Sequence, residues 1–227
     1  MQAKMDVKKN CILYLVRTSP DDLEMLQKSL GLVDANVLSS IHGKTDIILF
    51  HEKSFGQQYR DRVRHLQNGN IIFQEIEFTL QDYRDEIKKK ISEFYPHATN
   101  ANHRGFSMGY RHMCDFFSGS LYEQPILKNY EYYLRLDTDS FILSKIQYDI
   151  FEWMQTKKCE YAFIEPAVHH DHPSVIEGLW NETRQWLIEN NIVTQVPFDA
   201  LPEGKMFYTN FNICIIRMIN YTLPNFI

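Results

Sequence analysis

The stretch Tyr130-Glu-Tyr-Tyr-Leu-Arg-Leu-Asp-Thr-Asp139 joins an apolar, aromatic run to two closely spaced acids. Its first part, Glu131 to Leu136, predicts a buried strand, because such runs are typical of the interior of a sheet. Asp137 and Asp139 follow at once, at the carboxyl end of that strand. Open α/β sheets bind their ligands at this end, so the stretch predicts both the fold class and the place of the site.

Strands and helices are expected to alternate along the rest of the chain. Cys11 to Val16 predicts a first strand, and Ser19 with Pro20 predicts the start of a helix that Gly31 ends. Further strands are expected at 46–50, 71–78, 161–164 and 207–216, the last as one long strand or a pair. Further helices are expected from Ser54 to about Leu66, from Thr79 to Pro96, and over 108–118, 150–154 and 174–189. This order predicts an α/β fold with a mostly parallel sheet and helices on both faces.

Length and composition narrow the class of protein. The chain has 227 residues, 44% of them hydrophobic and 23% charged, which predicts one folded domain over 1–227. The net charge of -5 argues against a general nucleic-acid binder. No run approaches the roughly 20 apolar residues of a membrane span. The polar start, Met1 to Lys9, has no signal-peptide core, so a cytoplasmic location is expected, with a Golgi-type or viral-factory setting left open.

The two acids of the triplet predict a metal site. Asp137 and Asp139 place like charges in a small volume, which is costly unless a cation binds between them. Their hard oxygen ligands favour Mn²⁺ or Mg²⁺, which usually bind together with substrate phosphates. A solvated turn is the simpler interpretation of such a triplet. A metal phosphohydrolase is a third possibility, because paired acids also suit activation of water.

Two neighbouring motifs carry a resemblance to a known family. The stretch Gly109-Tyr-Arg-His-Met-Cys-Asp-Phe-Phe-Ser-Gly119, followed by Tyr130 to Asp139, resembles the fungal α-1,2-mannosyltransferases of glycosyltransferase family fifteen. That family has a Tyr-Arg-His-Met helix, a Ser-Gly pair, and Tyr-Tyr-Trp-Arg before an acidic triplet. Weaker similarity extends over nearly the whole chain and includes Phe207-Tyr-Thr-Asn-Phe-Asn-Ile213 near its end.

The resemblance implies a retaining, metal-dependent glycosyltransferase of the GT-A fold. It implies a nucleotide-diphosphate sugar donor, with GDP-mannose favoured, a sugar hydroxyl of a glycan or glycoprotein as acceptor, and Mn²⁺ or Mg²⁺ as cofactor. Asp137 and Asp139 would bind the metal, with Asp137 also near the diphosphate. Tyr110 and Asn212 would lie beside the reacting sugar as candidate catalytic residues. The remaining candidates for donor binding are Arg17, Tyr110, Arg111 and Ser118.

Departures from the family pattern leave a second interpretation open. The family triplet begins with Glu where this chain has Asp137, and the family glutamate near the anomeric carbon is replaced by Asn212, which cannot be a carboxylate nucleophile. Front-face attack with Asn212 only polarising, or a role for Glu165, are alternatives. The chain stops at Ile227, before the metal-binding His of the family, and the cluster 169–172 is a less favoured substitute. The alternative function is a catalytically impaired nucleotide-sugar-binding domain, or a fragment of a longer glycosyltransferase.

Overall fold

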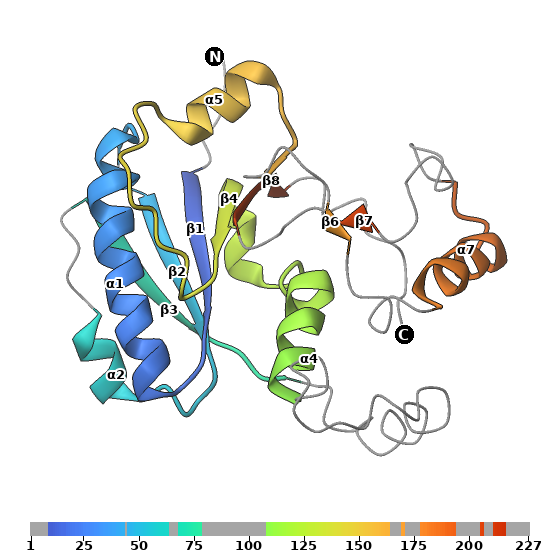
Figure 1. Ribbon diagram of the computed structural model, residues 1–227, viewed down its shortest axis with the longest axis horizontal. Helices are drawn as coiled ribbons and strands as arrows, with labels where there is room; N and C mark the ends of the chain where they lie inside the picture. Colours follow the sequence, from blue (N-terminus) through green and yellow to red (C-terminus); the bar gives the residue numbers. More distant parts are fainter. Residues whose placement is uncertain are drawn as a thin grey trace, which may run out of the picture. The chain divides into compact units, whose positions relative to one another are not determined.

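The computed structural model of the protein contains helices and strands along most of the chain (Figure 1). The described residues are 9–43, 45–63, 68–78, 108–163, 169–170, 178–193, 205–206 and 211–216. The chain divides into two compact units. The first contains 1–81, 112–163 and 209–227, and the second contains 82–111 and 164–208.

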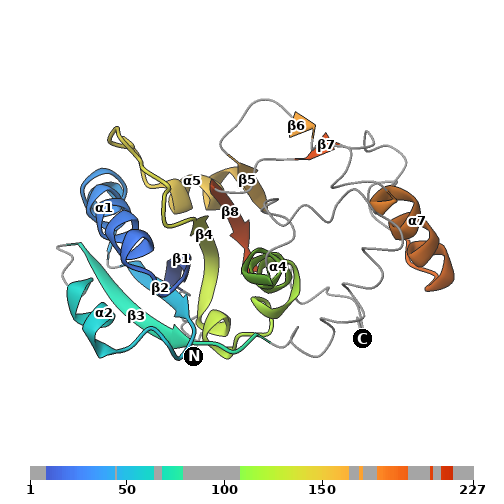
Figure 2. The ribbon, with the colours of Figure 1, turned by 60° about the horizontal axis from the view of Figure 1, so that its bottom comes forward.

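The first unit is built on a six-stranded sheet. Its strands are β1 (Lys9–Val16), β2 (Thr45–His51), β3 (Gly69–Glu75), β4 (Tyr130–Leu136), β5 (Tyr161–Phe163) and β8 (Phe211–Ile215). Their order is β3-β2-β1-β4-β8-β5, which can be followed from β3 to β8 in Figure 2. β1 pairs in parallel with β2 and β4, and β2 with β3, whereas β8 runs antiparallel to β4 and β5. The sheet is therefore mostly parallel, as the sequence predicts.

One face of the sheet is covered by helices α1 (Pro20–Asn36) and α5 (Ile150–Lys157), and Figure 1 shows α1 in front of β2 and β3. Its fully buried contacts include Leu23 and Leu26 from α1 and Phe151 and Met154 from α5. They pack against strand residues that alternate along β1, β2 and β4, as the two-residue period of a strand requires. Burial of this apolar surface is the main force that holds the two helices on the sheet.

The opposite face is covered by the segment after α4 (Met108–Asp115). This helix continues into the π-helical turn η4 (Phe116–Ser120), and the 3-10 helix η5 (Pro125–Asn129) follows. Phe116 and Leu127 are buried there against Leu13, Phe50 and Tyr133 of the sheet. Helical segments therefore cover both faces, which confirms the expected layer order.

The start of α1 is as predicted, but its end is not. Ser19 is the N-cap and its Oγ accepts a hydrogen bond from the amide of Asp22, with Pro20 in the first turn. The prediction that Gly31 stops the helix is wrong, because α1 continues to Asn36. Gly31 is exposed and faces open space, whereas Leu30 and Val33 nearby are buried and keep this part of the helix packed.

Two further boundaries differ from the sequence prediction. α2 (Gln57–Arg62) has Gly56 as its N-cap, so Ser54 does not start this helix. The Ser54 hydroxyl instead hydrogen-bonds Thr18 Oγ1 at 2.8 Å. β3 begins earlier than expected and ends at Glu75. The expected helix from Thr79 to Pro96 lies outside the described residues.

The second unit contains the helix α7 (Leu179–Glu189) and the short strands β6 (His169–His170) and β7 (Lys205–Met206), which pair antiparallel. α7 lies within the helix expected over 174–189, whose first residues are outside the described ranges. Across the part of the chain that the structure describes, no helix is long and apolar enough to cross a membrane.

Candidate functional site

The acidic triplet lies where β4 ends. Leu136 is fully buried, and the chain then turns through Asp137 to Ser140. The turn is fixed twice: the Asp137 amide donates to Ser140 Oγ at 3.1 Å, and the Ser140 amide donates to the Asp137 carbonyl at 2.9 Å. Because β4 is central in the sheet, this turn holds the acids at the carboxyl end of the parallel strands, where the sequence predicts a ligand site.

The two acids have different surroundings. The side chain of Asp137 is 23% exposed, whereas Asp139 is exposed. Burial raises the pKa of the Asp137 carboxyl above its ordinary value, Arg135 lowers it in part, and the charge of Asp139 raises it further. The ionised form of Asp137 is thus disfavoured without a cation, which is the electrostatic setting in which two carboxylates can hold a divalent metal ion.

Arg135 forms an ion pair with Asp137. Its Nη2 lies 3.3 Å from Asp137 Oδ1, and its guanidinium carbon lies 3.5 Å from the centre of the Phe117 ring. The side chain is 12% exposed, so the aromatic face of Phe117 replaces water on one side of the guanidinium. Sequence reasoning did not assign Arg135 to the site, although its position two residues before Asp137 places both side chains on the same side of the strand.

Asn212 faces Arg135 across the sheet. The two residues are directly paired in the antiparallel register of β4 and β8, so their side chains share one face. Asn212 is 5% exposed, and neither its Oδ1 nor Arg135 Nε has a hydrogen-bond partner within the described part of the chain. Buried polar atoms normally have a hydrogen-bond partner. Asn212 Oδ1 and Arg135 Nε therefore form a buried polar region next to the acidic turn.

Arg17 lies at the same edge of the sheet, directly after β1, the parallel neighbour of β4. Its Nε donates to Asp22 Oδ2, and Asp22 also accepts from Ser19 Oγ at 2.7 Å. This contact fixes one side of the guanidinium at the first turn of α1, while 75% of the Arg17 side chain stays exposed. The remaining N–H groups can reach an anionic ligand at the carboxyl edge.

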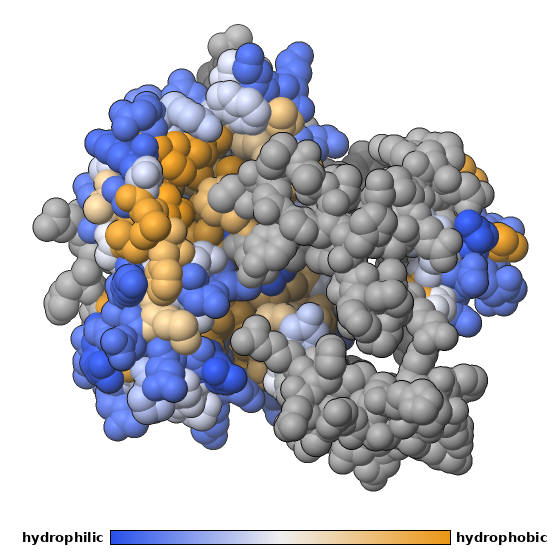
Figure 3. Space-filling model, in the orientation of Figure 1, coloured by the Kyte–Doolittle hydropathy of each residue, from blue (hydrophilic) through white to orange (hydrophobic). Residues whose placement is uncertain are grey.

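A strap of residues 140–149 holds the acidic turn against α1. Ser29 Oγ donates to the Ser140 carbonyl at 2.6 Å and also hydrogen-bonds Tyr14 Oη at 2.9 Å. Asn36 Nδ2 and Ser40 Oγ donate to two further strap carbonyls, each at 2.6 Å. Figure 3 shows apolar surface gathered over the strap, where Leu143 is 77% exposed. Sequence reasoning missed this support, since hydrogen bonds over a hundred residues apart leave no local signal.

The other candidates are placed separately. Tyr110 and Arg111 lie in the first half of α4, in the second unit, and Tyr110 is 41% exposed. Ser118 is exposed in η4, in the first unit, where its Oγ donates to the Asp115 carbonyl at 3.3 Å. The structure thus brings Asp137, Asp139, Asn212 and Arg17 to the ends of neighbouring strands. Glu165 and residues 171–172 lie outside the described residues.

A mostly parallel sheet with paired acids after a central strand is the architecture of GT-A nucleotide-diphospho-sugar transferases, and solved structures show the same fold. Core-mannan synthase A of Aspergillus fumigatus, in a Mn/GDP form, matches 97% of this chain and 63% of its own, with a TM-score of 0.77 at 19% identity. The mannosyltransferase Ktr4p of Saccharomyces cerevisiae, in complex with GDP, matches 95% of this chain and 59% of its own, with a TM-score of 0.72 at 23% identity.

The family model described as glycolipid 2-alpha-mannosyltransferase matches residues 1–214, and the chain belongs to this family. Glycolipid 2-alpha-mannosyltransferase 1 of Candida albicans is 29% identical over 92% of this chain and 49% of its own length. Alpha-1,2 mannosyltransferase KTR1 of Saccharomyces cerevisiae is 26% identical over 93% of this chain and 55% of its own length. The chain thus spans about half the length of these curated relatives.

Proposed function

We propose that residues 1–227 act as one glycosyltransferase-like domain that transfers a hexose from a nucleotide-diphosphate sugar to a sugar hydroxyl. Mannose is the favoured hexose. The observation that carries the proposal is the partly buried Asp137 beside Asp139 at the carboxyl end of β4. Membership of a mannosyltransferase family supports the sugar, and the GDP of the two solved relatives supports the nucleotide. The donor is therefore GDP-mannose, and the acceptor is a glycan or glycoprotein.

The donor set at the triplet fits a divalent metal ion. Two carboxylates of like charge meet there, and the raised pKa of Asp137 reflects the cost of its ionised form without a cation. Asp137 and Asp139 would hold Mn²⁺, or Mg²⁺, whose carboxylate preference they match. A bound ion supplies Lewis-acid stabilisation of the negative charge that develops on the departing diphosphate. Mn²⁺ is the ion named with the Aspergillus fumigatus relative.

The remaining roles belong to side chains of this chain. In the transfer, the bond from the anomeric carbon to the diphosphate oxygen breaks, a bond to the acceptor oxygen forms, and the acceptor hydroxyl loses its proton. Arg17 holds a donor phosphate or stacks on the base through the part of its guanidinium that Asp22 does not occupy. Tyr110, Arg111 and Ser118 complete the donor-binding set, as the family motif implies.

The identity of residue 212 determines whether the transfer can pass through a covalent glycosyl intermediate. An amide cannot form a covalent glycosyl ester, so we assign Asn212 the role of polarising the reacting sugar. Retention of the anomeric configuration then requires attack of the acceptor on the same face that the diphosphate leaves. Arg135 is the register partner of Asn212 in β4 and β8 and the ion-pair partner of Asp137.

The test is transfer from GDP-mannose to an α-mannoside acceptor in the presence of Mn²⁺. We expect an α-linked product, identified by NMR from its anomeric coupling, and little turnover with a UDP-sugar panel as matched control. No product from any donor, and no Mn²⁺-dependent nucleotide binding, would contradict the proposal.

A second candidate is a nucleotide-sugar-binding domain without catalysis. The observation that favours it is Asn212, which is uncharged and buried where the family has a glutamate. Tight, Mn²⁺-dependent GDP binding without transfer to any acceptor identifies this second function and excludes the first.

A further inference from the structure

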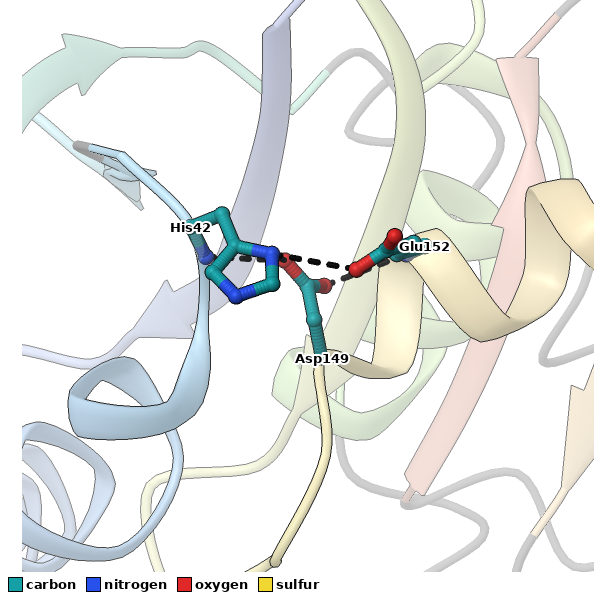
Figure 4. Close-up of side chains that lie close together, drawn as sticks. All are labelled: His42, Asp149 and Glu152. Carbon is teal, nitrogen blue, oxygen red and sulfur yellow. Dashed lines mark hydrogen bonds and ion pairs between the residues drawn. The ribbon is translucent and has the colours of Figure 1, made fainter.

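His42, Asp149 and Glu152 form a second group of metal-binding side chains in the first unit (Figure 4). His42 follows η1 (Leu38–Ser40), Asp149 closes the strap, and Glu152 lies in the first turn of α5. Their ligand atoms all lie within 4.8 Å of one another. We propose that these three residues bind one divalent ion of the zinc class, separate from the acids at the end of β4.

The distances fit a tetrahedral ion. His42 Nδ1 lies 3.0 Å from Glu152 Oε2 and 3.8 Å from Asp149 Oδ2. Zinc bonds to nitrogen and carboxylate oxygen measure about 2.0–2.2 Å, so neighbouring ligands of a tetrahedral site lie about 3.3 Å apart. The two observed distances bracket this value. All three ligand atoms lie within 4.8 Å of one another, and His42 and Glu152 are exposed, so these two side chains are the ones that would adjust to close the site.

Hydrogen bonds from backbone amides orient the Asp149 carboxylate for metal binding. Its Oδ1 accepts from the amides of Phe151 at 2.9 Å and Glu152 at 3.1 Å as the N-cap of α5, and its Oδ2 accepts from the His42 amide at 2.8 Å. A carboxylate offers about four lone-pair positions, so one remains, on the oxygen that faces His42 Nδ1. Backbone donors thus fix the orientation of this ligand, as outer partners do in metal sites.

The other two ligands leave the site open to solvent. The side chains of His42 and Glu152 are 82% and 61% exposed, so an ion can enter and keep a water in its fourth position. Two carboxylates with a neutral imidazole give a ligand charge of -2, which balances a divalent ion. Mixed imidazole and carboxylate ligands suit Zn²⁺, whereas Mn²⁺ prefers oxygen ligands, so the two sites of this chain would differ in metal.

An ion here would tie together two segments 107 residues apart in the sequence. It would join the turn before β2 to the start of α5, at the end of the strap that also carries the acidic turn. An ion that binds the folded chain and not the unfolded chain raises the melting temperature. Zn²⁺ should therefore stabilise the fold as well as bind.

The experiment measures Zn²⁺ bound per chain and the shift in melting temperature, on the full chain stripped with a chelator and dialysed against micromolar Zn²⁺. His42→Gln and Glu152→Gln remove one ligand each at exposed positions, so both variants should fold. We expect each variant to bind one Zn²⁺ fewer than the unaltered chain and to lose at least half of the Zn²⁺-dependent shift.

Glu24→Gln serves as the matched control, because Glu24 is an exposed acid on α1 away from the three ligands. It should keep both the bound ion and the shift. Zn²⁺ held elsewhere on the chain contributes equally to all four proteins and cancels in the comparison. The proposal is overturned if the unaltered chain binds no Zn²⁺ at 100-fold molar excess, if neither variant loses an ion, or if one variant alone does.

Discussion

Arg135 and Asp137 form an ion pair at the end of the central strand, with 3.3 Å between Nη2 and Oδ1. The pair is partly buried, and the guanidinium also stacks on Phe117. Arg135 therefore places a positive charge next to a partly buried acid of the candidate metal site.

Replacing Arg135 with Met should destabilise the fold at pH 7. It leaves the Asp137 carboxylate partly buried without its counter-charge, and we expect a loss of about 2 kcal/mol in the free energy of unfolding. Arg135→Lys should recover part of this loss. Urea denaturation measures both variants, and a Met variant as stable as the unaltered chain would show that the pair contributes nothing.

Replacing Asn212 with Ala should separate catalysis from binding. The proposed role of Asn212 is to polarise the reacting sugar, so the rate of transfer should fall about 100-fold, the usual effect of losing one such group. Affinity for GDP with Mn²⁺ should stay within about two-fold, since Asn212 is not assigned to the nucleotide. Single-turnover kinetics with calorimetry makes the comparison, and an unchanged transfer rate contradicts the role.

Replacing Ser29 with Ala tests the support of the acidic turn by α1. Ser29 is fully buried, and its loss leaves the Ser140 carbonyl and Tyr14 Oη without this partner. We expect destabilisation of about 1–3 kcal/mol. Ser39→Ala is the matched control, because the exposed Ser39 hydroxyl donates to the Ala35 carbonyl, four residues earlier at the end of α1, and it should change stability by less than about 0.5 kcal/mol. Equal effects of both substitutions would remove the special role of Ser29.

The buried His51 should make stability depend on pH. Burial lowers the pKa of His51, which is fully buried beside Phe55 and Phe73, below its ordinary value. The unfolded chain then binds a proton more readily than the folded chain. Stability should be full above about pH 6.5 and fall as the pH drops through the lowered pKa of the folded state.

His51→Phe removes the titrating imidazole from the aromatic cluster with Phe55 and Phe73. The variant should lose the part of the acid-side slope, between about pH 7 and pH 5, that His51 causes. Urea denaturation across this range measures the slope. An identical slope in His51→Phe and the unaltered chain would exclude His51 as its source.

Much of the fold was predictable because local signals agree with tertiary packing. Ser19, Pro20 and Asp22 determine the start of α1 through capping, which depends on neighbouring residues alone. The prediction that α1 ends at Gly31 was wrong, since a glycine ends a helix only where the residues beyond it bury no further apolar surface. Here Val33 lies on the buried side of α1 and the helix goes on past the glycine.

The site was predictable in part for a related reason. Asp137 and Asp139 follow directly from a strand pattern, so their place at the edge of the sheet could be inferred. Arg135 and Asn212 lie 77 residues apart, and their contact face depends on the antiparallel register of β8 with β4. The group of His42, Asp149 and Glu152 likewise arises from the path of the strap, which no local pattern indicates.

The most direct test of the central claim is calorimetric titration of GDP, with and without Mn²⁺, into the unaltered chain and Asp139→Ala. Asp139 is exposed, so its loss should leave the fold intact. We predict GDP binding that needs Mn²⁺ in the unaltered chain and in Glu24→Gln, and that weakens by at least about ten-fold in Asp139→Ala, as the loss of a carboxylate ligand requires. GDP binding that is the same with and without Mn²⁺, or unchanged in Asp139→Ala, would contradict a metal–diphosphate site at the end of β4.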